Sequence, residues 1–425
     1  MITIDNLLER QISLLPGDET KLLFPDYGGY NLVNLPWSIC SWLGLEITGK
    51  QGLGNAYPLD GEKYDRVILI LMDGLGWHRL QNWICNDTDG CMTVWKDLIA
   101  GKCLMPLTSI SPSTTCAALT TLNTGEPPIS HGNLAYELWL QEYNAVYNMI
   151  LQSSMPYRDN QGEQASNLLF PKNFLPVATI DAHIIKHGGA VTALHPASIA
   201  HSSLTRTLFP LASRGGYHSM GDLFYQIKNH ARANTDIPSY LYVYWSEIDE
   251  LSHVYGPNDP RVRVALCDFS RYLGDLKESL SLDSNGKTLV IVTADHGLQS
   301  TPIREEYDLS RHPSFLDNLE VWPTGENRLA FLHIKKGRAG KVRKYIESEW
   351  PGKFRVYDTS DVFATGLMGT GIVYEESPRR MGDLLIVALD EAYLWWSTRD
   401  DRLLGRHGSL SQHEMLVPLA LIPFG

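Results

Sequence analysis

An aspartate or a histidine, or both, follows each of four apolar runs in this chain, and both residue types suit metal chemistry. The runs are VILILM, YLYVYW, TLVIVT and LLIVAL, and a polar segment follows each of them. The residues of interest in these segments are Asp73, Asp249, His253, Asp295, His296 and His407. Carboxylate oxygens and imidazole nitrogens are ligands for Zn²⁺, Mn²⁺ or Fe ions in hydrolytic sites. Six such ligands suit two metal ions held about 4 Å apart.

The apolar runs themselves predict the elements that position these residues. Residues 64–71, 240–245, 288–293 and 384–389 are continuous apolar stretches, as expected of parallel strands that are covered on both faces. Helix-like stretches at residues 221–232 and 259–279 alternate with them. We therefore predict an α/β fold with a doubly wound, mostly parallel sheet and helices on both faces. Ligands bind at the carboxyl ends of such strands, so the six residues are expected to meet at one edge.

A serine- and threonine-rich segment between the first two ligand runs offers a nucleophile. It reads SPSTTCAALTTLNTG over residues 111–125, and a helix is expected to begin near residue 116. Ser113, Thr114 and Thr115 are candidate caps for this helix. A hydroxyl at a helix N-terminus lies beside backbone N–H groups that can bind an anion, and a metal ion would lower its pKa. An ordinary N-cap is the alternative interpretation.

The order of these elements suggests how the chain is divided. Residues 1–60 are expected to form an N-terminal wrap, and residues 61–303 together with 376–425 a catalytic α/β domain. Residues 304–375 are expected to form a small inserted α+β cap subdomain. Within it, we predict a strand at 328–334, a helix at 339–349 and a strand at 354–357.

Composition and charge exclude several classes of protein. The 425 residues include 36 Lys and Arg against 48 Asp and Glu, a net charge of −12 that disfavours binding to duplex nucleic acid. The apolar runs are too short to span a membrane, and the N-terminus does not read as a signal peptide. The six cysteines show no CxxC spacing, so we expect neither a disulfide framework nor a thiolate zinc site. A cytoplasmic protein is the expectation.

Taken in order, the motifs resemble the alkaline phosphatase superfamily, and in particular its nucleotide pyrophosphatase/phosphodiesterase-like branch. The motifs are VILILMDGLGW, SPSTTCAALTTLNTGEPPISHG, YWSEIDELSHVYGP, VTADHG and GRHGSLSQHEMLVPLAL. The resemblance implies two divalent metal ions and a covalent phospho-threonine intermediate. In that family the nucleophile lies ten residues before the glycine of a Thr-Gly turn. Counting back from Gly125 selects Thr115, with Thr114 as the alternative.

The resemblance also implies how the ligands are divided between two metal sites. One metal ion would be held by Asp73, Thr115, Asp295 and His296. The other would be held by Asp249, His253 and His407, with His413 excluded. Zinc is expected, and manganese or iron would also suit these ligands. Family diesterases often place an asparagine after the His-Gly pair that follows the nucleophile helix. Here Asn133 lies near that position and Tyr136 at it, so both are candidate substrate-binding residues.

These observations predict a two-metal phosphodiesterase or nucleotide pyrophosphatase that cleaves a phosphoester or phosphoanhydride bond through Thr115. The expected substrate is a small, nucleotide-like phosphorylated molecule. A metal-dependent phosphomonoesterase or phosphomutase of the same superfamily is the alternative, and a non-catalytic scaffold is an alternative of another class. The sequence leaves the oligomeric state open.

Overall fold

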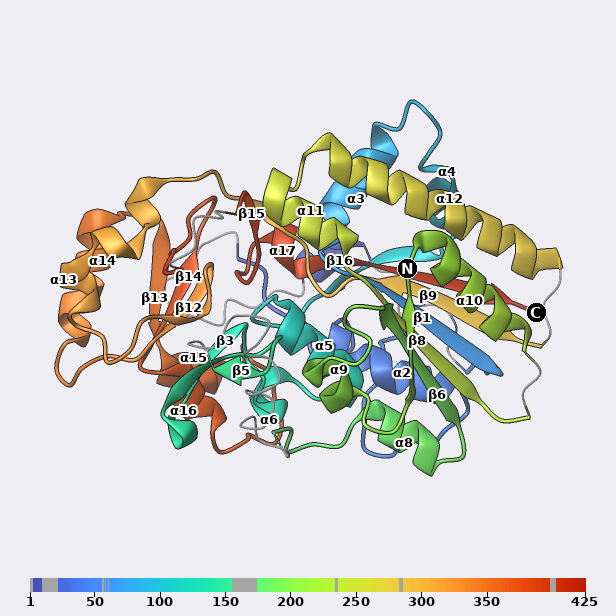
Figure 1. Ribbon diagram of the computed structural model, residues 1–425, viewed down its shortest axis with the longest axis horizontal. Helices are drawn as coiled ribbons and strands as arrows, with labels where there is room; N and C mark the ends of the chain where they lie inside the picture. The colour runs from blue at the N-terminus through green and yellow to red at the C-terminus, as the bar shows by residue number, and fades with distance from the viewer. Residues whose placement is uncertain are drawn as a thin grey trace.

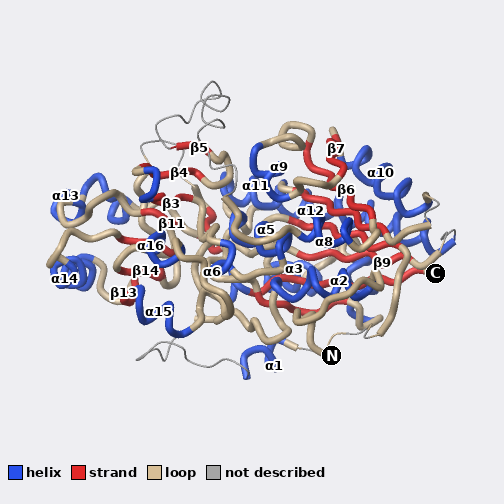
Figure 2. The backbone as a smooth tube through the Cα atoms, turned by 90° about the horizontal axis from the view of Figure 1, so that it is seen from below, coloured by secondary structure: helices blue, strands red, loops and turns tan. Residues whose placement is uncertain are grey.

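A computed structural model describes residues 3–9, 22–55, 57, 59, 61–154, 174–233, 236–282, 286–397 and 403–425. Part of the predicted N-terminal wrap at 1–60 lies outside these residues. Two lobes lie side by side along the longest axis (Figures 1 and 2). Each lobe is built on its own seven-stranded sheet.

The larger lobe contains the predicted mostly parallel sheet, which confirms the fold class. Its strand order is β2-β16-β9-β1-β8-β6-β7. β1 pairs in parallel with both β8 and β9, whereas β16 runs antiparallel to β9 and β2. The bounds are β1 Arg66–Met72, β2 Leu104–Thr108, β6 Ala190–Pro196, β7 Ser213–Tyr217, β8 Ser239–Trp245, β9 Thr288–Thr293 and β16 Leu416–Phe424. Every residue of β1, β8 and β9 is buried, which explains their unbroken apolar sequences.

Helices cover both faces of this sheet, as expected (Figure 1). α12 packs against α4 and α10 on one face, and α5 packs against α2, α8 and α9 on the other. The bounds are α1 Ile4–Glu9, α2 Leu35–Trp42, α3 Trp77–Cys85, α4 Thr93–Ala100, α5 Thr115–Thr124, α6 Pro128–His131, α8 Ile180–Lys186, α9 Ser203–Leu208, α10 Met220–Arg232, α11 Glu247–Tyr255, α12 Pro260–Leu282 and α17 Gln412–Met415. The described part of the N-terminal segment packs onto α5, where the Trp37 indole N–H donates to the Gly125 carbonyl over 2.7 Å.

The second lobe is an antiparallel sheet of order β13-β14-β12-β11-β3-β4-β5. Its strands are β3 Glu137–Leu140, β4 Ala145–Asn148, β5 Ser153–Ser154, β11 Thr324–Glu326, β12 Leu329–Leu332, β13 Phe354–Asp358 and β14 Leu384–Ala388. The helices that follow or connect these strands are α13 Pro313–Leu316, α14 Ala339–Glu349, α15 Thr359–Thr365 and α16 Ser377–Met381. The predicted strand–helix–strand unit is present as β12, α14 and β13. The sheet also takes strands from outside the predicted insertion at 304–375, namely β3, β4, β5 and β14.

One predicted strand was assigned to the wrong sheet. Residues 384–389 were expected to join the parallel sheet, but β14 lies between β12 and β13 in the second lobe and runs antiparallel to both. Leu385 and Val387 pack into the large core shared with the main sheet, whereas Leu384 and Ile386 pack into a separate core beside α14. The strand is apolar throughout because it lies between two cores, so its sequence resembles that of a buried parallel strand.

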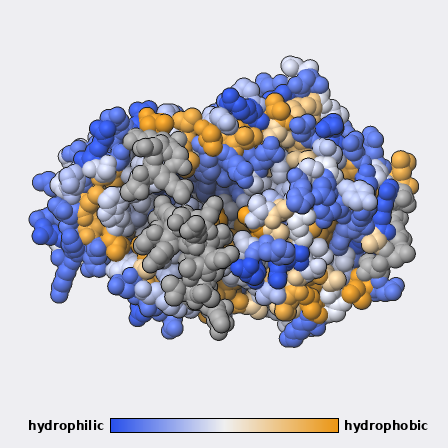
Figure 3. Space-filling view, in the orientation of Figure 1, coloured by the Kyte–Doolittle hydropathy of each residue, from blue (hydrophilic) through white to orange (hydrophobic). Residues whose placement is uncertain are grey.

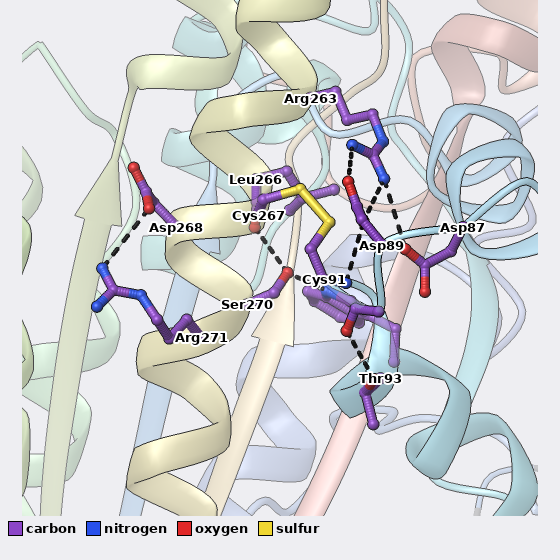
Figure 4. The surroundings of a disulfide bond; sticks show 12 residues. Asp87, Asp89, Cys91, Thr93, Arg263, Leu266, Cys267, Asp268, Ser270 and Arg271 are labelled. Atoms are coloured by element: carbon purple, nitrogen blue, oxygen red, sulfur yellow. Dashed lines mark hydrogen bonds and ion pairs between the residues drawn. A yellow bond between two sulfur atoms is a disulfide. The ribbon is translucent and has the colours of Figure 1, made fainter.

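One pair of cysteines forms a disulfide, although no disulfide framework was expected. Cys91, just before α4, is bonded to Cys267 of α12, with 5.2 Å between their Cα atoms (Figure 4). Arg263 forms ion pairs with Asp87 and Asp89 beside this bond. The two cysteines are 176 residues apart, so spacing along the chain could not reveal that the fold brings them together.

The surface shown in Figure 3 is mainly hydrophilic, with apolar residues in scattered patches. Among the described helices, none has the length and apolar content required to cross a bilayer.

Candidate active site

Four segments meet at the carboxyl-terminal edge of the main sheet and carry the predicted metal ligands. Asp73 directly follows β1, and Asp295 and His296 come two and three residues after the end of β9. α11 follows β8 and presents Asp249 and His253 one helical turn apart. His407 arrives by a different route from the one predicted. It follows the short strand β15 (Gly405–Arg406), which pairs with β10 (Gln299–Ser300) just beyond the β9 ligands.

The first predicted ligand group is assembled around the His296 imidazole. Its Nε2 atom lies 3.1 Å from Thr115 Oγ1, 3.5 Å from Asp73 Oδ1 and 3.6 Å from Asp295 Oδ2. All four residues are buried, and Thr115 is the first residue of α5. The structure therefore brings the hydroxyl of the predicted nucleophile together with its three predicted neighbours.

The second predicted group lies directly beside the first. His253 Nε2 is 3.2 Å from Asp249 Oδ2, and the His253 and His407 rings are 5.3 Å apart. The His407 ring stacks on the His296 ring with centroids 3.8 Å apart. Ligand atoms of Asp249, His296 and His407 lie within 4.8 Å of one another, so His296 belongs to both groups.

The three histidines are oriented in the same way. Each Nδ1 atom pairs with a backbone carbonyl: His253 with Gly405 at 2.8 Å, His407 with Ser113 at 3.0 Å and His296 with Gly297 at 3.1 Å. A carbonyl oxygen can only accept, so Nδ1 is the donor in each pair and Nε2 is the nitrogen directed at the cluster. Metal-binding histidines are commonly oriented by this kind of hydrogen bond.

The carboxylates also fit a cation site. Asp73 Oδ1, Asp249 Oδ1 and Asp295 Oδ2 are buried oxygens that accept no hydrogen bond in the described part of the chain. An unpartnered buried carboxylate oxygen is costly, and three carboxylates close together repel one another. Bound divalent cations would satisfy these oxygens and offset the negative charge. The donor set of carboxylate oxygens and imidazole nitrogens suits zinc, manganese or iron.

Electrostatics within the cluster shift several pKa values. Burial and the neighbouring charges of Asp295 and Asp249 raise the pKa of Asp73 well above its ordinary value. Burial alone would raise the pKa of Asp249, but its ion pair with His253 outweighs burial and lowers it. Burial and the nearby His296 lower the pKa of His407, which favours the neutral, ligand-competent imidazole. The three closely spaced carboxyl groups thus favour bound cations at this centre.

Two supporting residues escaped the sequence analysis. The Tyr244 hydroxyl, from the end of β8, donates to Asp73 Oδ2 and leaves Oδ1 facing the cluster. Gly74 has φ of +77°, and a Cβ atom there would lie 3.0 Å from Asp249 Cα. Its N–H donates to Asp295 Oδ1 over 3.1 Å. In YLYVYW the tyrosines alternate along the strand, so Tyr244 is expected near the carboxyl-terminal edge of the sheet, where the metal ligands lie. This pattern is a signal that could have identified it.

Two cavities meet at Thr115. The larger, of about 350 Å³, is lined by both lobes and includes Thr115, Asp249, His253 and His407. The smaller, of about 100 Å³, is lined by residues of α9 and β8. Thr115 and Ile150 line both cavities. The nucleophile candidate therefore stands between two separate spaces.

The two predicted substrate-binding residues differ in their placement. Tyr136 is 38% exposed and lines the larger cavity. Asn133 is buried, and its side-chain N–H groups donate to the Thr120 hydroxyl over 2.9 Å and to the Cys116 carbonyl over 3.3 Å. Asn133 thus supports α5 and is not among the described residues that line either cavity.

Excluding His413 from the ligands agrees with its position. Its ring lies 5.3 Å from the ring of His78, outside both ligand groups.

Glu326 of β11 lines the larger cavity and was not identified from the sequence, because it belongs to the second lobe and follows no recognisable motif. Burial raises its pKa to about 7.

Solved structures share this arrangement of elements. A murine ectonucleotide pyrophosphatase/phosphodiesterase 5 structure superposes with a TM-score of 0.61 and 19% identity, covering 83% of this chain and 87% of that chain. Phosphonoacetate hydrolase from Sinorhizobium meliloti 1021, in complex with phosphonoformate, gives a TM-score of 0.60 and 16% identity, covering 86% and 92%. At these identities the likeness shows the fold.

Sequence comparisons lead to the same family. Human ectonucleotide pyrophosphatase/phosphodiesterase family member 7 is 24% identical over 337 residues, which span 72% of this chain and 64% of that protein. Human family member 5 is 25% identical over 167 residues, which span 39% of this chain and 33% of that protein. The chain therefore matches less than two thirds of the length of either relative. The family model for type I phosphodiesterase/nucleotide pyrophosphatase matches residues 67–410. The chain belongs to this family.

Proposed function

We propose that the protein is a metal-dependent phosphodiesterase or nucleotide pyrophosphatase with Thr115 as its nucleophile. The observation that carries this proposal is the position of Thr115 Oγ1, 3.1 Å from His296 Nε2 and at the meeting point of two cavities. A diester phosphorus carries two substituents, and each cavity offers space for one of them. The same cluster of intact ligands argues against a scaffold that has lost activity.

The reaction would proceed in two displacements. The Thr115 hydroxyl gives up its proton to solvent and Oγ1 forms a bond to phosphorus, while the bond to the leaving-group oxygen breaks and that oxygen departs with the bonding electron pair. Water then attacks phosphorus and loses a proton, the bond to Thr115 breaks as Oγ1 regains a proton, and a phosphomonoester is released. Two divalent cations, when bound, would lower the pKa of the Thr115 hydroxyl and offset charge on the phosphoryl oxygens. The first-turn N–H groups of α5 would also favour that charge.

The residues around this centre keep the reacting groups in place. Hydrogen bonds from Nδ1 hold the three imidazole rings, and Tyr244 holds the Asp73 carboxylate. Asp73, Thr115, Asp295 and His296 would hold one cation, and Asp249, His253 and His407 the other, with zinc proposed for both.

A nucleotide-like substrate is proposed from the cavity lining and the relatives. Tyr136, Trp395 and Trp396 line the larger cavity and offer aromatic surfaces for a base. A murine family member 5 structure of an inactive threonine-to-alanine variant holds AMP. That description associates loss of activity with the replacement of a threonine, in keeping with a role for Thr115.

The test compares metal-loaded wild type with Thr115→Ala on bis(p-nitrophenyl) phosphate and p-nitrophenyl phosphate. We expect wild type to prefer the diester and Thr115→Ala to lose turnover while retaining metal by mass spectrometry. Thr114→Ala is the matched control: it should retain turnover, reduced by the loss of its hydrogen bond to Glu326 but not abolished. Near-normal activity in Thr115→Ala would refute the assignment, and a preference for the monoester would indicate the phosphatase or mutase alternative.

A further inference from the structure

Glu326 is a buried carboxyl group beside the nucleophile that the proposed reaction does not use. It ends β11 in the second lobe and is only 8% exposed. It lines the larger cavity together with Thr115, Asp249 and His407. A residue of one lobe thus reaches the reaction centre of the other.

Three contacts hold Glu326 in place. Its Oε1 accepts the Thr114 hydroxyl at 2.5 Å and the Tyr136 backbone N–H at 2.8 Å. Gly408, with φ of +115°, packs on its stem, because a Cβ atom there would lie 2.5 Å from Glu326 Cβ. The absence of a side chain at residue 408 therefore allows Glu326 to lie next to the segment that carries His407.

The contact with Thr114 also affects the start of the nucleophile helix. Thr114 is the N-cap of α5, yet its side chain makes no capping hydrogen bond to the helix. Its hydroxyl donates to Glu326 instead. The first-turn N–H groups, which have no partners within the helix, are thereby left uncapped by Thr114 and open to a phosphoryl group next to Thr115.

The second carboxyl oxygen points to a role in substrate selection. Within the described part of the chain, Oε1 takes both hydrogen bonds and Oε2 takes none. Oε2 is not fully enclosed by the protein. Because Glu326 lines the larger cavity, this oxygen is accessible to a substrate there. Burial raises the pKa of Glu326, and cations bound nearby would favour its charged form. The group can therefore place a negative charge beside the substrate.

We propose that Glu326 is a specificity-determining residue that favours phosphodiesters over phosphomonoesters. The inference rests on the proposed function. A diester carries one ionised oxygen, whereas a monoester above pH 7 carries nearly two negative charges. The additional charge of a monoester is repelled more strongly by a fixed carboxylate in a partly buried site than it would be in water.

The experiment measures kcat/KM for bis(p-nitrophenyl) phosphate and p-nitrophenyl phosphate at pH 8.5 with metal-loaded protein. Glu326→Gln keeps an oxygen that can accept from Thr114 and Tyr136 but removes the charge. We expect the diester-to-monoester ratio to fall about tenfold, mainly because the monoester reacts faster. The control Glu391→Gln removes a negative charge from an exposed ion pair with Arg304 and should leave the ratio unchanged.

A second variant separates charge from positioning. Thr114→Val removes the hydroxyl but leaves the Glu326 charge, so it should lower both activities by a similar factor and preserve their ratio. If Thr114→Val shifts the ratio as much as Glu326→Gln does, Glu326 acts through the helix and the proposal is wrong. An unchanged ratio in Glu326→Gln would also overturn it.

A binding measurement tests Glu326 independently of turnover. In a Thr115→Ala background, calorimetry with AMP should give a Kd about tenfold lower when Glu326→Gln is added. An equal or higher Kd would overturn the proposal. If wild type hydrolyses neither ester, the proposed function fails, but the AMP comparison still decides whether Glu326 disfavours a dianion.

Discussion

The Tyr244 hydroxyl provides a specific test of the metal centre. It donates to Asp73 Oδ2, and this bond leaves Oδ1 as the oxygen directed at the His296 side of the cluster. Tyr244→Phe removes the hydroxyl and leaves the ring. A hydrogen bond to a charged group contributes about 1.5–3 kcal/mol, and about 1.4 kcal/mol corresponds to a tenfold change in affinity. We therefore expect metal affinity at the Asp73 site to fall about 10- to 100-fold, the range typical for residues that orient metal ligands.

The assay is a competition titration of metal-free protein with a chelator of known affinity, which reads binding without turnover. Tyr242→Phe is the matched control. It removes a buried hydroxyl two residues earlier on the same face of β8, where the hydroxyl lies near Asn123. Tyr242→Phe should leave metal affinity within about twofold of wild type, since that hydroxyl does not bond to a ligand carboxylate. Equal losses in the two variants, or no loss in Tyr244→Phe, would refute the reasoning.

Two further predictions concern the histidines near the C-terminal end of the chain and the disulfide-bonded cysteines. His407→Ala should reduce bound metal by about one ion per chain while His413→Ala leaves it unchanged, as measured by mass spectrometry; the reverse result would exchange their roles. The cytoplasmic location stays a prediction, and it implies that Cys91 and Cys267 are reduced in living cells. Alkylation of intact cells followed by peptide mass spectrometry would test this, because an oxidised pair indicates an oxidising compartment.

Much of the site could be predicted because the relevant signals are local in the sequence. An apolar run predicts a buried strand, and in a parallel sheet the carboxyl ends of all strands meet at one edge. Asp73, Asp249 and Asp295 could therefore be expected to lie together before any contact was known. The spacing of Asp249 and His253 on one helix is likewise a local property of the chain.

Other features depend on contacts between distant segments. The apolar sequence of β14 indicates that both faces of the strand are buried, but it does not indicate to which sheet the strand belongs. The strand was therefore predicted in the wrong sheet. Asn133 follows a recognisable motif, yet its side chain turns toward α5 because the Thr120 hydroxyl and the Cys116 carbonyl lie there. Cys91 and Cys267 become neighbours only when α12 packs beside α4.

The ligand types, their order and the main fold class follow from the sequence, because strand burial and the geometry of parallel sheets leave little choice. The shape of the larger cavity and the placement of Glu326 in it do not, because they arise where two lobes meet. Glu326 is 211 residues from Thr115 along the chain, and no local pattern links them. The packing of β11 against the start of α5 and against Gly408 is what places its carboxyl group at the reaction centre.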